Sequence, residues 1–198
     1  KLKEKNSKWI NDDYVKFIRY AEHLIDKTGE GILAYITNHS YLDNPTFRGM
    51  RFRLLQSFDE IWIIDLHGNA KKKEKGPDGT ADKNVFDIQQ GVAIIIAIKK
   101  KVSKGALSAL HHFDVWGDRE NKFRQLRETP KPFQLPYQTL QPQAPHYFFV
   151  PKNFDHIEEF QKGISVNQLF VNYGVGITTA HDDFVIHFDR NVLFDRFS

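Results

Sequence analysis

The chain has 198 residues, 40% of them apolar and 14% aromatic, which is enough for a packed core in one or two domains. The lack of cysteine excludes disulfide bonds and thiolate metal sites, and a net charge of +3 is compatible with nucleic-acid binding without requiring it. The longest apolar run, residues 91–98, is much shorter than the roughly 18 residues of a membrane span, so we expect a cytoplasmic protein that does not enter a membrane.

Helical and extended patterns alternate in the first third of the chain. Apolar residues recur at helical spacing over residues 12–27 and again over residues 48–58, which predicts two helices. Residues 31–37 and 60–66 are short and almost continuously apolar, as is typical of strands buried on both faces of a parallel sheet. The order helix, strand, helix, strand therefore predicts a parallel α/β sheet.

A long polar loop then interrupts this alternation. Residues 67–85 contain few apolar side chains, and loops of about twenty residues in a compact domain are usually functional or disordered. The loop leads into a strongly apolar run, residues 91–100, that ends in lysines. Because no helix separates this run from residues 60–66, we expect the two to form an antiparallel hairpin at the edge of the sheet.

The second half of the chain has a different texture. We expect a short strand at 111–117, a helix at 118–128 and, over residues 129–146, an extended proline-rich connector without regular structure. The remaining patterns are an apolar stretch at 147–150, a helix at 153–162, an apolar stretch at 166–171, a glycine turn at 173–179, a strand at 183–188 and a helical ending at 189–198.

Several strings carry a family resemblance, notably "GILAYITNHSYLDNPTFRGMRFRLL", "IWIIDLHGNAKKKEKGPDG" and "NVFDIQQGVAIIIAIKK". They resemble the carboxyl half of the methyltransferase domain in amino-group adenine DNA methyltransferases. The likeness is strongest to large single-chain restriction–modification enzymes that fuse nuclease, sometimes helicase, methyltransferase and target-recognition parts. It is dense over residues 8–100 and looser over 111–127, and residues 174–188 are similar to the lead-in of a target-recognition region.

The resemblance implies an α/β fold in two parts. Residues 1–100 would form the carboxyl half of a Rossmann-like sheet of an S-adenosylmethionine (SAM)-dependent methyltransferase. Residues 101–198 would be a mixed α+β connector and the start of the target-recognition region. In such enzymes the SAM-binding half and an Asn-Pro-Pro-Tyr tetrad precede the helix that residues 12–27 resemble.

We therefore expect a fragment of an adenine-N6 DNA methyltransferase that neither binds SAM nor methylates DNA alone. Its expected partners are double-stranded DNA and the remaining domains of the parent enzyme. The alternative is a non-catalytic DNA-binding or assembly module. An exposed sheet edge would also allow self-association, because unpaired strand edges recruit partners.

The run Asn44-Pro45-Thr46-Phe47 differs by one residue from this tetrad in the form Asn-Pro-Pro-Phe, since Tyr or Phe can occupy its last position. In the tetrad an Asn side chain and a backbone carbonyl accept hydrogen bonds from the adenine amine, and an aromatic ring lies against the extruded base. A helix entry fits every residue of the run, with Asp43 or Asn44 as the N-cap and Pro45 in the first turn. Because Thr46 replaces the stiffening proline, we expect the capping role.

Phe86 stands just ahead of the apolar run at 91–100. The resemblance assigns this position to an aromatic residue that stacks on the extruded adenine, an interaction worth roughly 1–3 kcal/mol per base. The competing interpretation is a phenylalanine that plugs the edge of the sheet.

Four lysines in the polar loop, Lys71, Lys72, Lys73 and Lys75, are candidates for contacts with DNA phosphates. A solvated, mobile loop explains the same run of charge equally well.

Asn38 and His39 end the first predicted strand, at the position where ligands gather in open α/β sheets. They would either line the cleft near the target base or cap the strand end.

The nine histidines are scattered along the sequence. His111 and His112 are adjacent in a predicted strand, so their side chains should point to opposite faces, and no His-x-Glu or His-x-x-x-His spacing accompanies them. Asp182, Asp183 and Asp189 lack the Glu-x-Lys partner of a nuclease site. We therefore expect no metal site.

Overall fold

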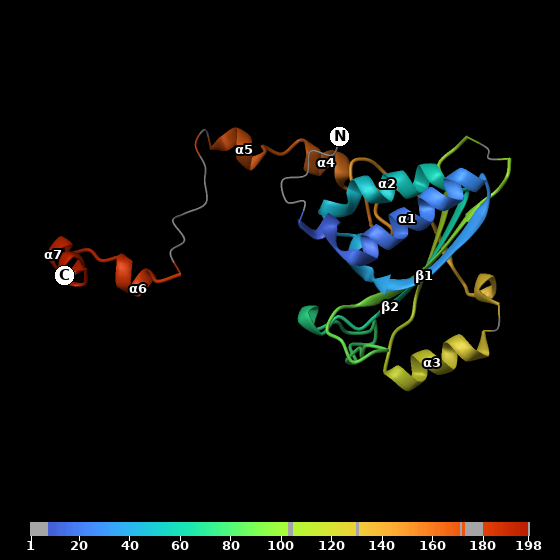
Figure 1. Cartoon of the computed structure of the whole chain (residues 1–198), viewed down its shortest axis with the longest axis horizontal. Coiled ribbons are helices and arrows are strands. Elements are labelled where there is room, and N and C mark those ends of the chain that lie inside the picture. The colour runs from blue at the N-terminus through green and yellow to red at the C-terminus, as the bar shows by residue number, and fades with distance from the viewer. Residues whose placement is uncertain (1–7, 103–104, 130, 171, 173–179, 198) are drawn as a thin grey trace. The chain divides into compact units, whose positions relative to one another are not determined.

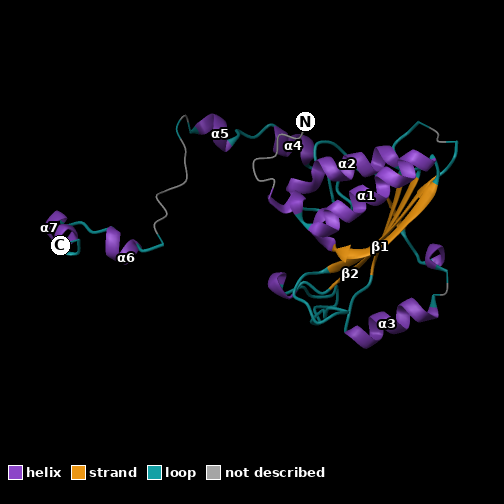
Figure 2. Cartoon of the chain, viewed as in Figure 1, coloured by secondary structure: helices purple, strands orange, loops and turns teal. Residues whose placement is uncertain are grey.

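The computed structural model describes residues 8–102, 105–129, 131–170, 172 and 180–197. The chain divides into two compact units, Lys1–Lys152 and Asn153–Ser198. The first unit contains a five-stranded mixed sheet with helices against it, and the described part of the second contains only short helices (Figure 2).

The sheet has the strand order β1-β3-β2-β4-β5. β3 runs antiparallel to both of its neighbours, β2 and β4 are parallel, and β5 runs antiparallel to β4. As a result β1, β2 and β4 all point the same way. The strands are β1 (Gly31–Asn38), β2 (Glu60–His67), β3 (Val92–Lys99), β4 (Ala109–Asp114) and β5 (Gln138–Leu140).

Helices cover both faces of this sheet (Figure 1). α1 (Asp13–Thr28) and α2 (Arg48–Ser57) pack their apolar residues on one face, and α3 (Arg119–Glu128) packs on the other. Among the described residues, no helix is long and apolar enough to cross a bilayer. The short helices are η1 (Lys8–Asn11), η2 (His39–Leu42), η3 (Pro45–Phe47), η4 (Ala70–Lys72), η5 (Pro132–Gln134), α4 (Ile157–Gln161), α5 (Val166–Leu169), α6 (Asp182–Val185) and α7 (Arg190–Asp195).

The predicted helices at 12–27, 48–58 and 118–128 are confirmed as α1, α2 and α3. The helix entry is confirmed as well. The Asn44 side chain accepts a hydrogen bond from the Thr46 backbone N–H at 2.9 Å, and Pro45 occupies the first position of η3.

The sheet itself differs from the prediction in two respects. The strand expected to be buried on both faces, β1, lies at the edge of the sheet, and Ile32 is 66% exposed because α1 covers only the opposite face. The run expected at the edge, β3, lies between β1 and β2. Its unbroken apolar sequence suits a strand with a neighbour on each side.

Two predictions for the second half of the chain are wrong. Residues 138–140 of the connector form the edge strand β5, which pairs with β4. Residues 183–188 do not form a strand. Asp182–Val185 form helix α6 instead, and no strand lies in the described part of this unit to pair with them. The predicted glycine turn at 173–179 lies outside the described residues.

Arg51 of α2 fastens the turn after β1 to a distant segment. Its guanidinium is fully buried and donates hydrogen bonds to the carbonyl oxygens of Tyr41 at 2.7 Å, Asn44 at 2.9 Å and His146 at 2.6 Å. The planar fork of arginine satisfies several carbonyl groups that the compact ammonium of lysine does not reach together. The turn that carries His39 is thereby fixed against residues near 146.

Replacing Arg51 with lysine should lower the free energy of unfolding by about 2 kcal/mol or more, because buried carbonyl groups lose a charged donor. Urea denaturation measures this change. Arg127→Lys, at an exposed position of α3, is the matched control and should change stability by no more than about 0.5 kcal/mol. Equal stability of the two variants would contradict the role given to Arg51.

Candidate nucleic-acid interface

The carboxyl ends of β1, β2 and β4 meet at one edge of the sheet, since these three strands point the same way. The amino end of the antiparallel β3 lies at the same edge. The long loop from Gly68 to Gly91 joins β2 to β3 here and so lies over the strand ends. Ligands of open α/β sheets bind at edges of this kind.

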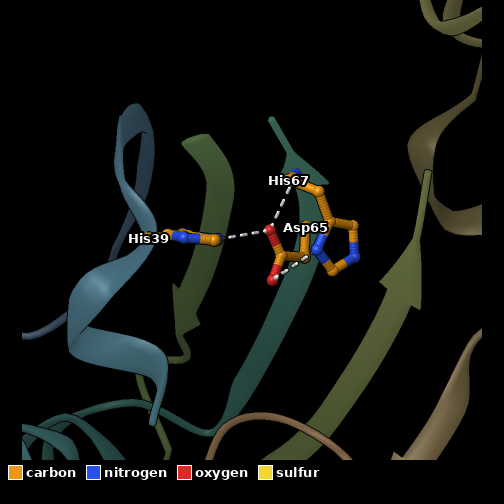
Figure 3. Close-up of side chains that lie close together, drawn as sticks. All are labelled: His39, Asp65 and His67. Atoms are coloured by element: carbon orange, nitrogen blue, oxygen red, sulfur yellow. Dashed lines mark hydrogen bonds and ion pairs between the residues drawn. The ribbon is translucent and has the colours of Figure 1, made fainter. Parts of the chain in front are cut away.

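Asp65 of β2 lies between two histidine rings at this edge (Figure 3). The His39 ring nitrogen Nδ1 is 3.0 Å from Asp65 Oδ1, and that oxygen also accepts the backbone N–H of His67 at 3.0 Å. Nδ1 of the His67 ring is 3.8 Å from Asp65 Oδ2. All three side chains are buried, so the group forms a hydrogen-bonded support beneath the loop.

Small residues at the start of β3 and just before it let His39 reach across to Asp65. β3 separates β1 from β2, and Ala93 is the residue on β3 that pairs with both Thr37 and Asp65. The ring of His39 lies directly over Gly91, where an added Cβ would come within 2.2 Å of His39 Nε2. A side chain at position 91 would therefore displace the histidine.

His39 and Asp65 each stabilise the charged form of the other. Burial alone lowers the pKa of His39, but the hydrogen bond and negative charge of Asp65 outweigh it and raise that pKa above the usual value. Burial alone raises the pKa of Asp65, but the hydrogen bond from His39 and the neighbouring imidazoles lower it. The carboxyl group is thus held ionised.

The end of β4 continues this cluster. Nε2 of His67 is 2.7 Å from Asp114 Oδ1, and Nδ1 of His112 is 3.7 Å from Asp114 Oδ2. Burial of His112 lowers the pKa of its ring. His67 also stacks on Trp116, with ring centroids 3.4 Å apart.

A buried ion pair fixes the long loop to α3. The Lys122 ammonium contacts Asp82 Oδ2 at 2.8 Å, and both side chains are fully buried. It also donates hydrogen bonds to the carbonyl oxygens of Leu66 at 2.6 Å and Lys83 at 2.7 Å, so three acceptors surround it. The other carboxylate oxygen of Asp82 accepts the Gly117 N–H at 2.8 Å.

Asn84 sets the position of Phe86 within this loop. Its amide nitrogen donates to the carbonyl oxygens of Gly68 at 3.0 Å and Gln90 at 2.6 Å, while its oxygen accepts the Phe86 N–H at 2.8 Å. Phe86 is 44% exposed and borders an open cleft of about 800 Å³. The cleft is also lined by Gly68, Ala70, Asp82, Lys83, Asn84, Asp87, Ile88, Gln89, Asp118, Arg119 and Glu120.

The other predicted site residues lie around the same edge in different environments. The four lysines, Lys71, Lys72, Lys73 and Lys75, are all exposed on the loop. The side chain of Asn38 accepts the Ser40 N–H at 2.8 Å and so caps η2. His39 is buried and lies behind the loop.

The sequence patterns did not single out Asp65, His67 or Asp114, and His112 was considered only for metal spacings that it lacks. The available signal was His112-x-Asp114, which places both side chains on one face of β4, whereas the pairing register of β2 shifts between Asp65 and His67. Nothing in the sequence distinguished Lys122 from an ordinary helix-surface lysine.

A comparison with protein families finds no match, and a comparison with curated protein sequences finds none either. Solved structures do match. The ATP-dependent Type ISP restriction–modification enzyme LlaBIII bound to DNA is 25% identical with a TM-score of 0.76, over 97% of this chain and 13% of that one.

Two further DNA complexes share the fold. A DrdV–DNA complex is 22% identical with a TM-score of 0.70, over 98% of this chain and 20% of that one. A nuclease-deletion mutant of the Type ISP restriction–modification enzyme LlaGI with a DNA substrate mimic is 20% identical with a TM-score of 0.73, over 98% and 16%. The chain thus spans a fifth or less of each match, and its fold is that of one segment of DNA-bound restriction–modification enzymes.

Replacing Lys122 with methionine should lower the free energy of unfolding by about 3–5 kcal/mol, because Asp82 is left as an uncompensated buried charge. Urea denaturation measures the loss. Arg124→Met, at an exposed position on the same helix, is the control. The double variant Lys122→Met/Asp82→Asn should lose less stability than Lys122→Met alone. A double variant that is less stable still would show that the buried charge is not the cause.

Proposed function

We propose that this chain is the DNA-facing part of the adenine-N6 methyltransferase in a restriction–modification enzyme. The observation that carries the proposal is Phe86, a half-exposed aromatic ring that Asn84 fixes at the mouth of a cleft beside the strand ends. The likeness to DNA-bound restriction–modification enzymes supports it. In this proposal the face of Phe86 receives the extruded adenine.

The ring of Phe86 has the properties that a base platform needs. An exposed fraction of 44% favours the platform over the interpretation in which the ring plugs the sheet edge. The Asn84 side chain donates two hydrogen bonds to the loop backbone and accepts one from the Phe86 N–H, so the backbone that carries the ring is held in place before DNA arrives. Preorganisation of this kind reduces the entropy lost when a base is bound.

The charges around the cleft suit a neutral base and its flanking phosphates, because Asp82 and Asp87 of its lining are ion-paired and the loop lysines are exposed nearby. Asp82 is neutralised by Lys122, and Asp87 is paired with Arg119. Asp118 caps α3 by accepting the Asn121 N–H. The exposed lysines of the loop remain available for the phosphates on either side of an extruded nucleotide.

The cofactor is assigned to other parts of the parent enzyme. The connections from β1 to α2 and from β4 to α3 contain one glycine between them, Gly117, so neither is the glycine-rich turn that lets a nucleoside cofactor approach the backbone. We therefore give no residue of this chain to SAM. The chain's own contribution is to bind the extruded base and the DNA backbone, and a tetrad elsewhere would orient the adenine amine.

In the intact enzyme, Phe86→Ala should lower kcat/KM for DNA methylation about 5- to 150-fold, which corresponds to the roughly 1–3 kcal/mol of base stacking. Phe86→Trp should retain most of the activity because it keeps an aromatic face. Phe17→Ala, which removes an exposed ring on α1, is the control. If Phe86→Ala methylates DNA as fast as the wild type, Phe86 is not the base platform. If the wild type shows no methylation and Phe86→Ala only loses DNA binding, the alternative of a non-catalytic DNA-binding module is favoured.

Exchanging Lys71, Lys72, Lys73 and Lys75 for glutamine should weaken binding of the chain to duplex DNA and flatten its salt dependence. The slope of log K against log salt should fall by about 0.9 for each lysine that contacts a phosphate. Fluorescence anisotropy at several salt concentrations measures it. The control exchanges Lys16, Lys27, Lys100 and Lys101 for glutamine, which removes the same number of positive charges outside the loop. If the control changes the slope as much as the loop variant does, the loop lysines are not specific DNA contacts.

A further inference from the structure

Two neighbouring strands end in complementary pairs of possible metal ligands. β2 ends in Asp65-x-His67 and β4 in His112-x-Asp114. In the parallel register Asp65 lies beside Asp114, and Ile63 lies beside His112, so Asp65, His112 and Asp114 share one face of the sheet. One ligand atom from each of these three side chains lies within 4.8 Å of the others.

His112 is the observation that points to a ligand. Its side chain is 1% exposed, and neither ring nitrogen has a hydrogen-bond partner among the described residues. Leaving a buried polar group unpaired costs about 1–3 kcal/mol, so native structures rarely contain one. His112 Nδ1 faces an acidic group, Asp114 Oδ2, at 3.7 Å.

One oxygen of Asp65 and one of Asp114 are held by a histidine, which leaves the other oxygen of each carboxylate for a metal ion. Asp65 Oδ1 is 3.0 Å from His39 Nδ1, and Asp114 Oδ1 is 2.7 Å from His67 Nε2, so each carboxylate has a second oxygen to offer. Hydrogen bonds of this kind orient the carboxylates that ligate metals. Within the described part of the chain the charged contacts of both carboxylates are with histidines and none is with a lysine or arginine, so the cluster can accept the charge of a dication.

We propose that Asp65, His112 and Asp114 bind a divalent transition-metal ion of the zinc class. Bonds of about 2.0–2.2 Å to nitrogen and oxygen place tetrahedral ligand atoms about 3.3 Å apart, which requires only a small closure of the cluster. A set with an imidazole suits Zn²⁺ or Co²⁺, whereas Mg²⁺ and Ca²⁺ prefer oxygen alone. The ion joins the ends of β2 and β4 and, through Asp65, supports His39 beneath the loop.

The proposal can be tested on the 198-residue chain without DNA, so its outcome is independent of the proposed function. Chelator-treated protein is titrated with Co²⁺, followed by visible absorption and by thermal unfolding. We expect binding of one ion per chain, the d–d bands of a four- or five-coordinate site and a higher Tm. Zn²⁺ should then displace Co²⁺ and abolish the bands.

Variants make the assignment specific. His112→Leu should lose the bands and the rise in Tm, while its metal-free form stays folded because the change removes an unpaired polar group. His111→Ala is the matched control, since this neighbour points to the other face and stacks on Trp62 at 4.0 Å, and it should bind like the wild type. Asp114→Asn provides a second loss-of-ligand variant should His112→Leu not fold.

Three outcomes would overturn the proposal. The first is the absence of d–d bands in the wild type, and the second is half-saturation only at millimolar Co²⁺, as for ordinary surface carboxylates. The third is a spectrum that survives both His112→Leu and Asp114→Asn.

Discussion

The hydrogen bond between Asp65 and His39 links the central strand β2 to the turn after the edge strand β1, across the antiparallel strand β3 that separates them. It forms because Ala93 of β3 and Gly91, the residue just before β3, are small, so that a carboxylate on β2 meets an imidazole that follows β1. The loop that carries Phe86 rests on this pair. His39 packs on the loop's last residue, Gly91, and its Nε2 lies 3.4 Å from the Asn69 amide near the loop's beginning.

The loop from Gly68 to Gly91 is long, but hydrogen bonds and a buried ion pair hold it against the sheet and α3. Its first and last parts are joined by the hydrogen bond from Ala70 N–H to the Gln89 carbonyl at 3.0 Å, and its middle is fixed by Lys122 through Asp82. The four lysines and Phe86 are among the loop residues that remain exposed to solvent. The loop thus presents an exposed aromatic ring and exposed positive charges, the two kinds of group that contact an extruded base and its flanking phosphates.

Local sequence patterns predict individual helices and caps, but they do not predict which strands lie next to each other in the sheet. The helical spacing of Val15 and Ile18, and the capping chemistry of Asn44, depend on residues close in sequence, and α1 and η3 follow them. Strand order depends on contacts between distant segments. A continuous isoleucine run such as that of β3 is equally consistent with an edge or a centre until its partners are known, so β1 and β3 were misplaced.

The same limit applies to the site: residues identified by their local sequence could be predicted, whereas residues brought together by contacts between distant segments could not. Phe86 and the lysines could be proposed from their place in the sequence, because a resemblance identified the loop. The buried cluster could not, since Asp65 and Asp114 are brought together by the pairing of β2 with β4. Likewise Lys122 has the sequence context of a solvent-facing helix residue, and only the fold of the loop over α3 surrounds it with acceptors.

The role of Phe86 is tested most directly by a structure of the intact enzyme on duplex DNA that contains its recognition sequence. We expect one adenine extruded from the duplex with its face against the Phe86 ring, and phosphates of the same strand within reach of Lys71, Lys72, Lys73 and Lys75. A target base bound away from Phe86, or DNA bound on another edge of the sheet, would contradict it.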